Sequence, residues 1–296
     1  MEITPDNLRR LRTSFIGDWR KAYEGTPTFW QQIAMRVPSS TSQNDYGWMA
    51  TIPEVQEWIG PRVIHDLSAH EYTLKNKPYE LTLGVKRDDI KDDNLGIYST
   101  RAQAHGQAFA RHPDNLIKSV LEGNPDCFDG QPFFDGDHPI DANDTAKGTY
   151  SNLFTSKALT QANFLAVRAA MTEYVGEEGR NLGILPRLLV VPAALEGTAI
   201  EICKNERDAA GASNTTRNMA DYLVIPGLSS STTWYLMDVS RLIMPFIFQE
   251  RESPLIVAKE SDSDTEVLVD GQYRLYGSMR GNAGVSLPFL ASKCTA

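Results

Sequence analysis

One short segment of this 296-residue sequence concentrates the side chains that could do chemistry. It runs from Asp129 to Pro139, with the sequence DGQPFFDGDHP, and holds three carboxylates and one histidine. Carboxylates and imidazoles act as general acids and bases, and they also bind divalent metals. The chemistry that this composition would support is acid/base or metal-assisted hydrolysis by the residues from Asp129 to His138.

The same segment also fits a pair of turns followed by a histidine. Asp-Gly dipeptides stand at 129–130 and 135–136, and this dipeptide is favoured in turns for its backbone geometry and not for its acidity. No second set of ligands at a fixed spacing supports a metal. We therefore predict turns here, with no catalytic residue, no metal site and no cofactor.

The rest of the sequence offers no complete catalytic motif. The patterns GxxxxGK[ST], HExxH and GxSxG do not occur, and no GxGxxG follows a strand. The other histidines form two pairs with spacings of 5 and 7, which do not make an i, i+4 metal pair. We expect them to be packing or surface residues: His65, His70, His105 and His112.

Composition and charge exclude several classes of protein. Hydrophobic residues make up 41% and charged residues 23%, which predicts one large or two small folded domains. The net charge is −9 and no run of Lys and Arg occurs, so any DNA that the protein meets is expected to be enclosed and not gripped. Neither a membrane span nor a secretory signal is predicted. Three widely spaced cysteines predict free thiols in a cytosolic protein: Cys127, Cys203 and Cys294.

The first part of the chain predicts an arm followed by a long extension. Residues 1–45 combine a helical pattern with a polar link and have no core of their own, so this arm must dock on something else. Residues 46–85 carry a strand pattern at 46–52, a turn at Gly60-Pro61 with a return through 62–64, and a second strand pattern at 79–85, which together predict a long hairpin-like excursion. The helical pattern of the arm consists of Leu8, Leu11, Phe15 and Trp19.

The remaining chain alternates between helix and strand patterns, which indicates an α+β fold. A helix is predicted at 99–123, where Pro113 either kinks it or opens a second helix. The polar residues 204–220 predict an exposed loop, and Asp270-Gly271 predicts a hairpin between 267–269 and 273–276. Further helices are predicted from 160 and near 195–202, and further strands at 188–191, 222–225, 233–237 and 243–248.

A series of short stretches resembles the Mu-like prophage major head subunit family, often called gpT. Their order and their spread from residue 46 to near the end carry the resemblance, and the first 45 residues match least. The stretches are Tyr46-Gly47-Trp48-Met49, Trp58-Ile59-Gly60-Pro61-Arg62, Tyr72-Thr73-Leu74-Lys75-Asn76-Lys77, Asp92-Asp93-Asn94-Leu95-Gly96, Phe128-Asp129-Gly130-Gln131-Pro132-Phe133-Phe134, His138-Pro139, Trp234-Tyr235-Leu236, Pro245-Phe246-Ile247-Phe248-Gln249 and Tyr276-Gly277-Ser278-Met279-Arg280-Gly281-Asn282-Ala283-Gly284.

The resemblance implies the Hong Kong 97-type (HK97-type) capsid fold and the function of a major capsid protein, which is not an enzyme. In that fold an N-terminal arm and an extended loop reach neighbouring subunits, a peripheral domain holds a long spine helix, and an axial domain lies near the symmetry axes. We therefore expect residues 204–220 to be a mobile loop near a pentamer or hexamer axis. The implied boundaries are 1–45 for the arm, 46–85 for the extended loop, 86–150 and 241–296 for the peripheral domain, and 151–240 for the axial domain.

The resemblance also implies partners. They are further copies of the chain in pentamers and hexamers, a portal, and packaged double-stranded DNA bound without sequence specificity, in a virion assembled in the host bacterial cytoplasm. Some relatives fuse a scaffolding segment of roughly a hundred residues before the arm, a full domain's length. Such a length is not available here, so we expect a separate scaffolding protein. Some relatives crosslink a Lys to an Asn, and nothing in the sequence assigns that role to Lys75, Asn76 or Lys77.

The extension carries the predicted contact between subunits. Its apolar residues are too many to remain in water, and its tip is predicted to lodge against a neighbouring subunit. Two alternatives stay open, a hydrolase that uses Asp129 to His138 and a virion protein that decorates the shell or binds DNA. The predicted contact residues are Trp58, Ile59, Gly60, Pro61 and Arg62.

Overall fold

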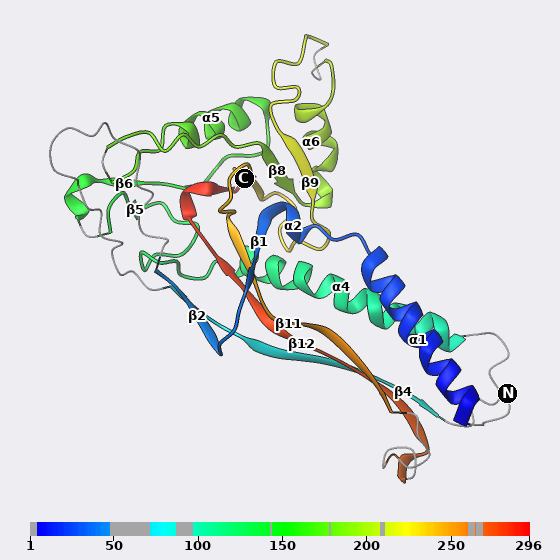
Figure 1. Ribbon diagram of the computed structural model, residues 1–296. Coiled ribbons are helices and arrows are strands. Elements are labelled where there is room, and N and C mark those ends of the chain that lie inside the picture. The colour runs from blue at the N-terminus through cyan, green and yellow to red at the C-terminus, as the bar shows by residue number, and fades with distance from the viewer. Residues whose placement is uncertain are drawn as a thin grey trace.

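The computed structural model describes residues 5–47, 72–86, 97–142, 144–177, 179–207, 211–259, 264 and 269–296. Within these residues the chain forms two sheets of more than two strands, each covered by helices (Figure 1). Strands and helices are mixed along the chain, which confirms the predicted α+β class. None of the helices in the described part of the chain is long and apolar enough to cross a membrane.

The first sheet has four strands and contains the longest strands of the described chain. Its order is β1-β11-β12-β4, with β1 parallel to β11 and the other neighbours antiparallel. Buried positions alternate along β12 from Tyr273 to Ala283, because one face of a strand points to the core and the other to solvent. The strands are β1 (Ala34–Pro38), β11 (Phe246–Lys259), β12 (Gln272–Val285) and β4 (Lys77–Lys86).

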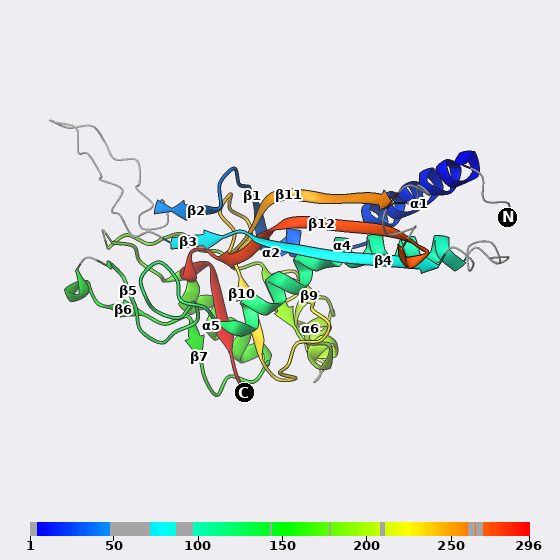
Figure 2. The ribbon, with the colours of Figure 1, turned by 90° about the horizontal axis from the view of Figure 1, so that it is seen from below.

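Helix α4 (Ile97–Gly123) packs on this sheet, and α1 (Pro5–Gly25) packs along α4 (Figures 1 and 2). Both contacts depend on glycine. A Cβ at Gly277 would lie 2.3 Å from the Phe109 ring, and a Cβ at Gly106 would lie 2.4 Å from the Trp19 carbonyl oxygen. The two glycines therefore set how closely the sheet and the two helices approach one another.

A single helix passes through Pro113, which decides between the two predicted alternatives. Proline removes one helical hydrogen bond and clashes with the preceding turn. The helix continues because apolar side chains on both sides of the proline are buried in the same core, among them Phe109, Ile117 and Leu121. Burial of such side chains contributes about 1.5–3 kcal/mol each.

The second sheet has five strands in the order β7-β13-β10-β8-β9. Strands β8 and β10 are buried along their whole length, as expected of central strands covered on both faces. Helices α5 (Gln161–Thr172) and α6 (Glu196–Cys203) pack against it, and the Thr160 side chain caps α5 by accepting from the Asn163 N–H. The strands are β7 (Leu153–Phe154), β13 (Ala291–Cys294), β10 (Trp234–Met237), β8 (Leu188–Val191) and β9 (Asp221–Val224).

Smaller elements complete the described chain. Two short ribbons pair β2 (Gln43–Tyr46) with β3 (Tyr72–Lys75) and β5 (His138–Pro139) with β6 (Thr149–Tyr150). The four-residue helix α2 (Trp30–Ile33) precedes β1. Single turns of 3₁₀-helix lie at Thr145–Lys147, Ala193–Leu195 and Pro288–Leu290.

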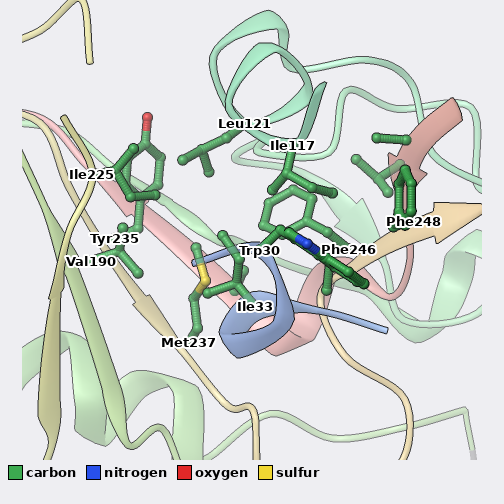
Figure 3. Packing of buried hydrophobic residues seen from close by; sticks show 14 of the residues in the cluster. Trp30, Ile33, Ile117, Leu121, Val190, Ile225, Tyr235, Met237, Phe246 and Phe248 are labelled. Carbon is green, nitrogen blue, oxygen red and sulfur yellow. The ribbon is translucent and has the colours of Figure 1, made fainter. Parts of the chain in front are cut away.

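The two sheets share one hydrophobic core (Figure 3). Trp30 and Ile33 of α2 lie at its centre, where the Trp30 ring meets Phe248 at 4.9 Å. Ile117 and Leu121 reach it from α4, and the second sheet contributes Val190, Tyr235 and Met237. The N-terminal segment is therefore part of the core of this chain, and the expected arm docks on its own subunit.

One prediction about strand pairing is wrong. Residues 274–276 pair with 257–259 on one side and with 82–84 on the other, so they do not form the predicted hairpin with 267–269. Residues 79–85 form the predicted strand, and their partner is β12. The C-terminal strand β13 lies in the second sheet, between β7 and β10. The pattern at 273–276 identifies a strand, but its partners lie farther away in the sequence and have no local signal.

Candidate functional site

The candidate chemical segment folds into turns directly after α4, as predicted. Gly130 has φ +81°, a conformation that glycine adopts without strain, and its N–H donates to the Cys127 carbonyl at 3.1 Å. The Asp135 carboxylate accepts from the Asp137 N–H at 3.1 Å, which closes the second turn. The Asp135 carboxylate therefore serves backbone geometry in this structure.

Asp129 differs from the other two aspartates because its carboxylate is buried. Its Oδ2 lies 2.7 Å from His138 Nδ1, and its Oδ1 accepts from the Cys127 thiol at 2.8 Å and from the Gln131 N–H at 3.0 Å. Burial raises the pKa of Asp129, but the hydrogen bonds from His138, Cys127 and Gln131 outweigh it and leave the pKa below its ordinary value. The carboxylate is therefore ionised and fully engaged by its neighbours.

Cys127 joins this group although the sequence pattern gave no sign of it. Burial, followed by the charge of Asp129, raises the pKa of the Cys127 thiol well above its ordinary value. A thiol becomes a strong nucleophile only as the thiolate. The three side chains thus form a closed polar cluster, which we call the Cys-Asp-His cluster (Cys127, Asp129 and His138).

A second buried polar group fixes the base of the extension, which is the ribbon of β2 and β3. Gln249 of β11 has no exposed surface, and its Oε1 accepts from the Tyr46 hydroxyl at 2.7 Å. Its Nε2 donates to the Leu74 carbonyl at 3.0 Å and to Asn76 Oδ1 at 2.8 Å. Both ends of the extension, at β2 and β3, are therefore fixed to the central sheet. The amide of Asn76 is occupied here, donating to Ser39 Oγ and to the Thr41 carbonyl.

The predicted contact residues Trp58, Ile59, Gly60, Pro61 and Arg62 lie outside the described residues. Their chain leaves the described part after Gly47 and returns at Tyr72. The structure therefore shows how the two ends of this segment are held by Gln249, and it does not describe the contacts of the predicted tip.

In its described part, the polar segment after α6 has buried side chains at Asn214 and Thr216, whereas the sequence predicts a loop that is exposed throughout. Asn214 is buried and its Nδ2 donates to the carbonyls of Glu201, Ile202 and Asn205 at 2.8, 3.1 and 2.9 Å. The buried hydroxyl of Thr216 donates to the Ile202 carbonyl at 2.9 Å. The last carbonyls of a helix need partners from outside it. Polar side chains supply them here, where we expected solvent.

Large apolar side chains are exposed on the far part of the first sheet. Leu255 and Val257 lie two apart on β11 and share a face, with 60% and 44% of their surfaces exposed. Residues paired across the sheet share a face, and β12 contributes Tyr276 opposite Val257. The opposite face of the sheet, at Gly277, contacts α4. The outer face of the sheet is therefore a candidate contact surface.

The model of one protein family, the Mu-like prophage major head subunit gpT, matches residues 8–158, 153–228 and 224–296 of this chain. These ranges together cover nearly the whole sequence. The chain belongs to this family. It is a head subunit of a Mu-like phage, a structural protein of the virion and not an enzyme. The alternative of a hydrolase that uses Asp129 to His138 has no support in this family.

Two relatives of the gpT-family head subunit support the family assignment, because both are head or capsid proteins. The major capsid protein of Escherichia phage Mu is 32% identical over 286 residues, which cover 96% of this chain and 72% of that protein. The Mu-like prophage FluMu major head subunit of Haemophilus influenzae is 26% identical over 284 residues, 95% of this chain and 71% of that protein.

Solved structures identify the fold of the head subunit. A chain from the procapsid of bacteriophage JBD30 superimposes with a TM-score of 0.64 at 30% identity, over 99% of this chain and 76% of that chain. A chain from the capsid of cyanophage P-SCSP1u superimposes with a TM-score of 0.58 at 10% identity, over 92% of this chain and 88% of that chain. The head subunit therefore has the HK97-type capsid fold, as predicted.

Proposed function

We propose that this head subunit assembles with copies of itself, as pentamers and hexamers, into an icosahedral shell that encloses phage double-stranded DNA. The observation that carries the proposal is the likeness over 99% of the chain to a subunit of the JBD30 procapsid. The net charge of −9 is consistent with a shell that encloses DNA without gripping it, because an acidic wall repels phosphates. A separate scaffolding protein and a portal would complete the assembly in the host cytoplasm.

The proposal includes an assignment of the two sheets to the domains of the capsid fold. We infer that the first sheet with α4 forms the peripheral domain and that the second sheet with α5 and α6 forms the axial domain. Support comes from the order of elements, because residues 151–240 supply all strands of the second sheet except β13 and so interrupt the first unit. On this assignment α4 is the spine helix.

The extension from residue 46 to 85 is the proposed contact with neighbouring subunits. Its sequence carries Trp48, Ile52, Trp58 and Ile59, and large apolar side chains gain about 1.5–3 kcal/mol each on full burial. The buried hydrogen bonds of Gln249 support this role, because they fix β2 and β3 to the central sheet, so that a contact at the tip of the extension is mechanically coupled to the sheet. We propose Trp58, Ile59, Gly60, Pro61 and Arg62 as the tip that lodges against the next subunit.

A density map of assembled particles tests the proposal. The chain should be co-expressed with the scaffolding protein of its phage and the particles reconstructed at high resolution. Five and six copies of the chain should surround each type of axis, with residues 151–240 nearest the axis. A map in which the chain lies on the outside of a shell built by another protein would establish decoration instead.

A further inference from the structure

His138 faces oxygen acceptors with both ring nitrogens. Nδ1 lies 2.7 Å from Asp129 Oδ2, and Nε2 lies 3.2 Å from the carbonyl oxygen of Phe133. A neutral imidazole carries one N–H and so can donate to only one of these two acceptors. The side chain of His138 has no exposed surface and that of Asp129 has 2%, so water does not resolve the mismatch. With a neutral ring, one of the two acceptors therefore has no donor from His138, and a metal ion bound by Nδ1 and Asp129 would remove this mismatch.

The donor atoms suit a metal as well as a proton. One ligand atom each from Cys127, Asp129 and His138 lie within 4.8 Å of one another. Thiolate, imidazole and carboxylate are the ligands of protein-bound Zn²⁺, at about 2.0–2.3 Å. Asp129 turns Oδ1 toward the sulfur and Oδ2 toward the ring, so a bidentate carboxylate would make four donor atoms from three side chains.

The surrounding groups match the outer shell of a zinc site. A metal-bound histidine commonly donates its other N–H to a backbone carbonyl, which fixes the tautomer. The Phe133 carbonyl oxygen lies 3.2 Å from His138 Nε2, where it would accept this N–H, and the same oxygen accepts from Asn152 Nδ2 at 2.7 Å. The ring of Tyr150 stacks on His138 at 5.3 Å, and the Gln131 N–H holds Asp129 Oδ1. The ligands are therefore oriented and shielded from water.

We propose that Cys127, Asp129 and His138 form a structural Zn²⁺ site. When Zn²⁺ enters, the Cys127 sulfur loses its proton to solvent and binds the metal as a thiolate. The imidazole of His138 binds as the neutral ring through the Nδ1 lone pair, with its N–H at Nε2. A thiolate, a carboxylate, a neutral imidazole and Zn²⁺ sum to zero charge, so the occupied site leaves no uncompensated buried charge, which would be costly.

The position of the cluster gives the metal a structural role. Its three residues span Cys127 to His138, the segment that leads from the end of α4 toward the second sheet. Cys127 belongs to the core shared by both sheets, and the neighbouring Phe128 packs against the core under α5 and α6. A metal here would hold the connection between the two units.

Metal content of the folded subunit tests the site directly. The full chain should be purified, refolded with a slight excess of Zn²⁺, freed of loose metal by gel filtration and analysed for zinc by mass spectrometry. We expect about one zinc per chain in the parent and in Cys203→Ser, which changes a buried cysteine outside the cluster. Cys127→Ser and His138→Gln should retain about a tenth or less.

Cobalt supplies a readout that does not require any variant to fold. Co²⁺ bound to the parent should give a thiolate-to-cobalt charge-transfer absorption in the near ultraviolet. A folded parent that retains no zinc and gives no such absorption would establish that the cluster holds protons only. Equal zinc in the parent and in folded cluster variants would place the metal elsewhere and equally overturn the site.

Discussion

The Tyr46 hydroxyl donates a hydrogen bond of 2.7 Å to Gln249 Oε1, across 203 positions of sequence. Tyr46 ends β2, the last described strand before the extension, and Gln249 lies in the core-facing part of β11. Burial raises the pKa of Tyr46 to about 12, so the hydroxyl remains a donor at any physiological pH. The pair connects the root of the proposed subunit contact to the central sheet.

Removing the Gln249 amide should weaken this connection. Gln249→Leu removes the Gln249 acceptor of the Tyr46 hydroxyl and the donor to the Leu74 carbonyl and Asn76 Oδ1, and a buried polar group that loses a hydrogen bond costs about 1–3 kcal/mol. We expect urea unfolding of the unassembled subunit to lose at least about 2 kcal/mol. The exposed Gln32 gives a matched control, because Gln32→Leu should change stability by about 0.5 kcal/mol or less. Equal effects of the two changes would contradict the buried network.

Alanine substitution of two helical glycines should change the stability of the subunit in opposite directions. Gly106→Ala would drive a Cβ to 2.4 Å from the Trp19 carbonyl and separate α1 from α4, at a cost of about 1–3 kcal/mol. Gly17 lies in α1, and no atom of the described residues is within 4 Å of a Cβ placed there, so Gly17→Ala should stabilise by about 0.5–1 kcal/mol. Thermal unfolding of the subunit measures both. A tolerated Gly106→Ala would show that α1 does not hold this position on its own chain.

His105 should make stability depend on pH. Its Nδ1 accepts from the Trp19 indole N–H at 2.9 Å and its Nε2 faces the Leu81 carbonyl at 2.8 Å, which fits the neutral ring. Burial lowers the pKa of His105, and the contact with Leu81 offsets this only in part. The unfolded chain therefore takes up the proton first, and stability falls as pH drops from the unfolded value of about 6.5 toward the folded one.

The measurement is urea unfolding at about pH 7.5 and about pH 5.5. The parent should lose stability on acidification, and His105→Gln should lose less of it. His112, whose pKa burial also lowers, remains in both proteins and contributes equally. The same loss in parent and variant would exclude His105 as the titrating group.

Sequence periodicity predicted elements well and pairings poorly. Helix α5 was recognisable from its apolar spacing, and β8 from a short run of apolar residues. A strand pattern defines which side chains share a face, because the period is two, but it contains no information about the neighbouring strand. The pairing of 79–85 with β12 therefore had to come from the structure.

The two polar sites were harder to predict because their partners are not adjacent in sequence. Asn214 and Thr216 have the composition of a solvated loop, yet they bind the free carbonyls at the end of α6. Cys127, Asp129 and His138 match no motif at their spacing, and only the turn at Gly130 brings them together. A side chain that hydrogen-bonds the backbone of a distant residue cannot be recognised from a single sequence, because no local pattern accompanies it.

The proposed tip of the extension can be tested with two substitutions of one residue. Trp58→Asp should leave the free subunit folded and prevent closed shells, because a charge cannot replace buried aromatic surface worth about 1.5–3 kcal/mol per contact. Trp58→Phe should assemble nearly as well as the parent. Electron microscopy of co-expressed particles and circular dichroism of free subunits separate the two effects. Unfolding of the free Asp variant would place Trp58 in the core of its own subunit, and normal shells would exclude it from the contact.

The mass of the assembled product tests the central claim most directly. The chain has a mass of 32.9 kDa, and it should be co-expressed with its scaffolding protein, purified and measured by sedimentation with light scattering. A shell-building subunit should yield closed particles of hundreds of copies, roughly ten megadaltons in order of magnitude. Only monomers or small oligomers, under conditions where the scaffolding protein is present and folded, would contradict the account.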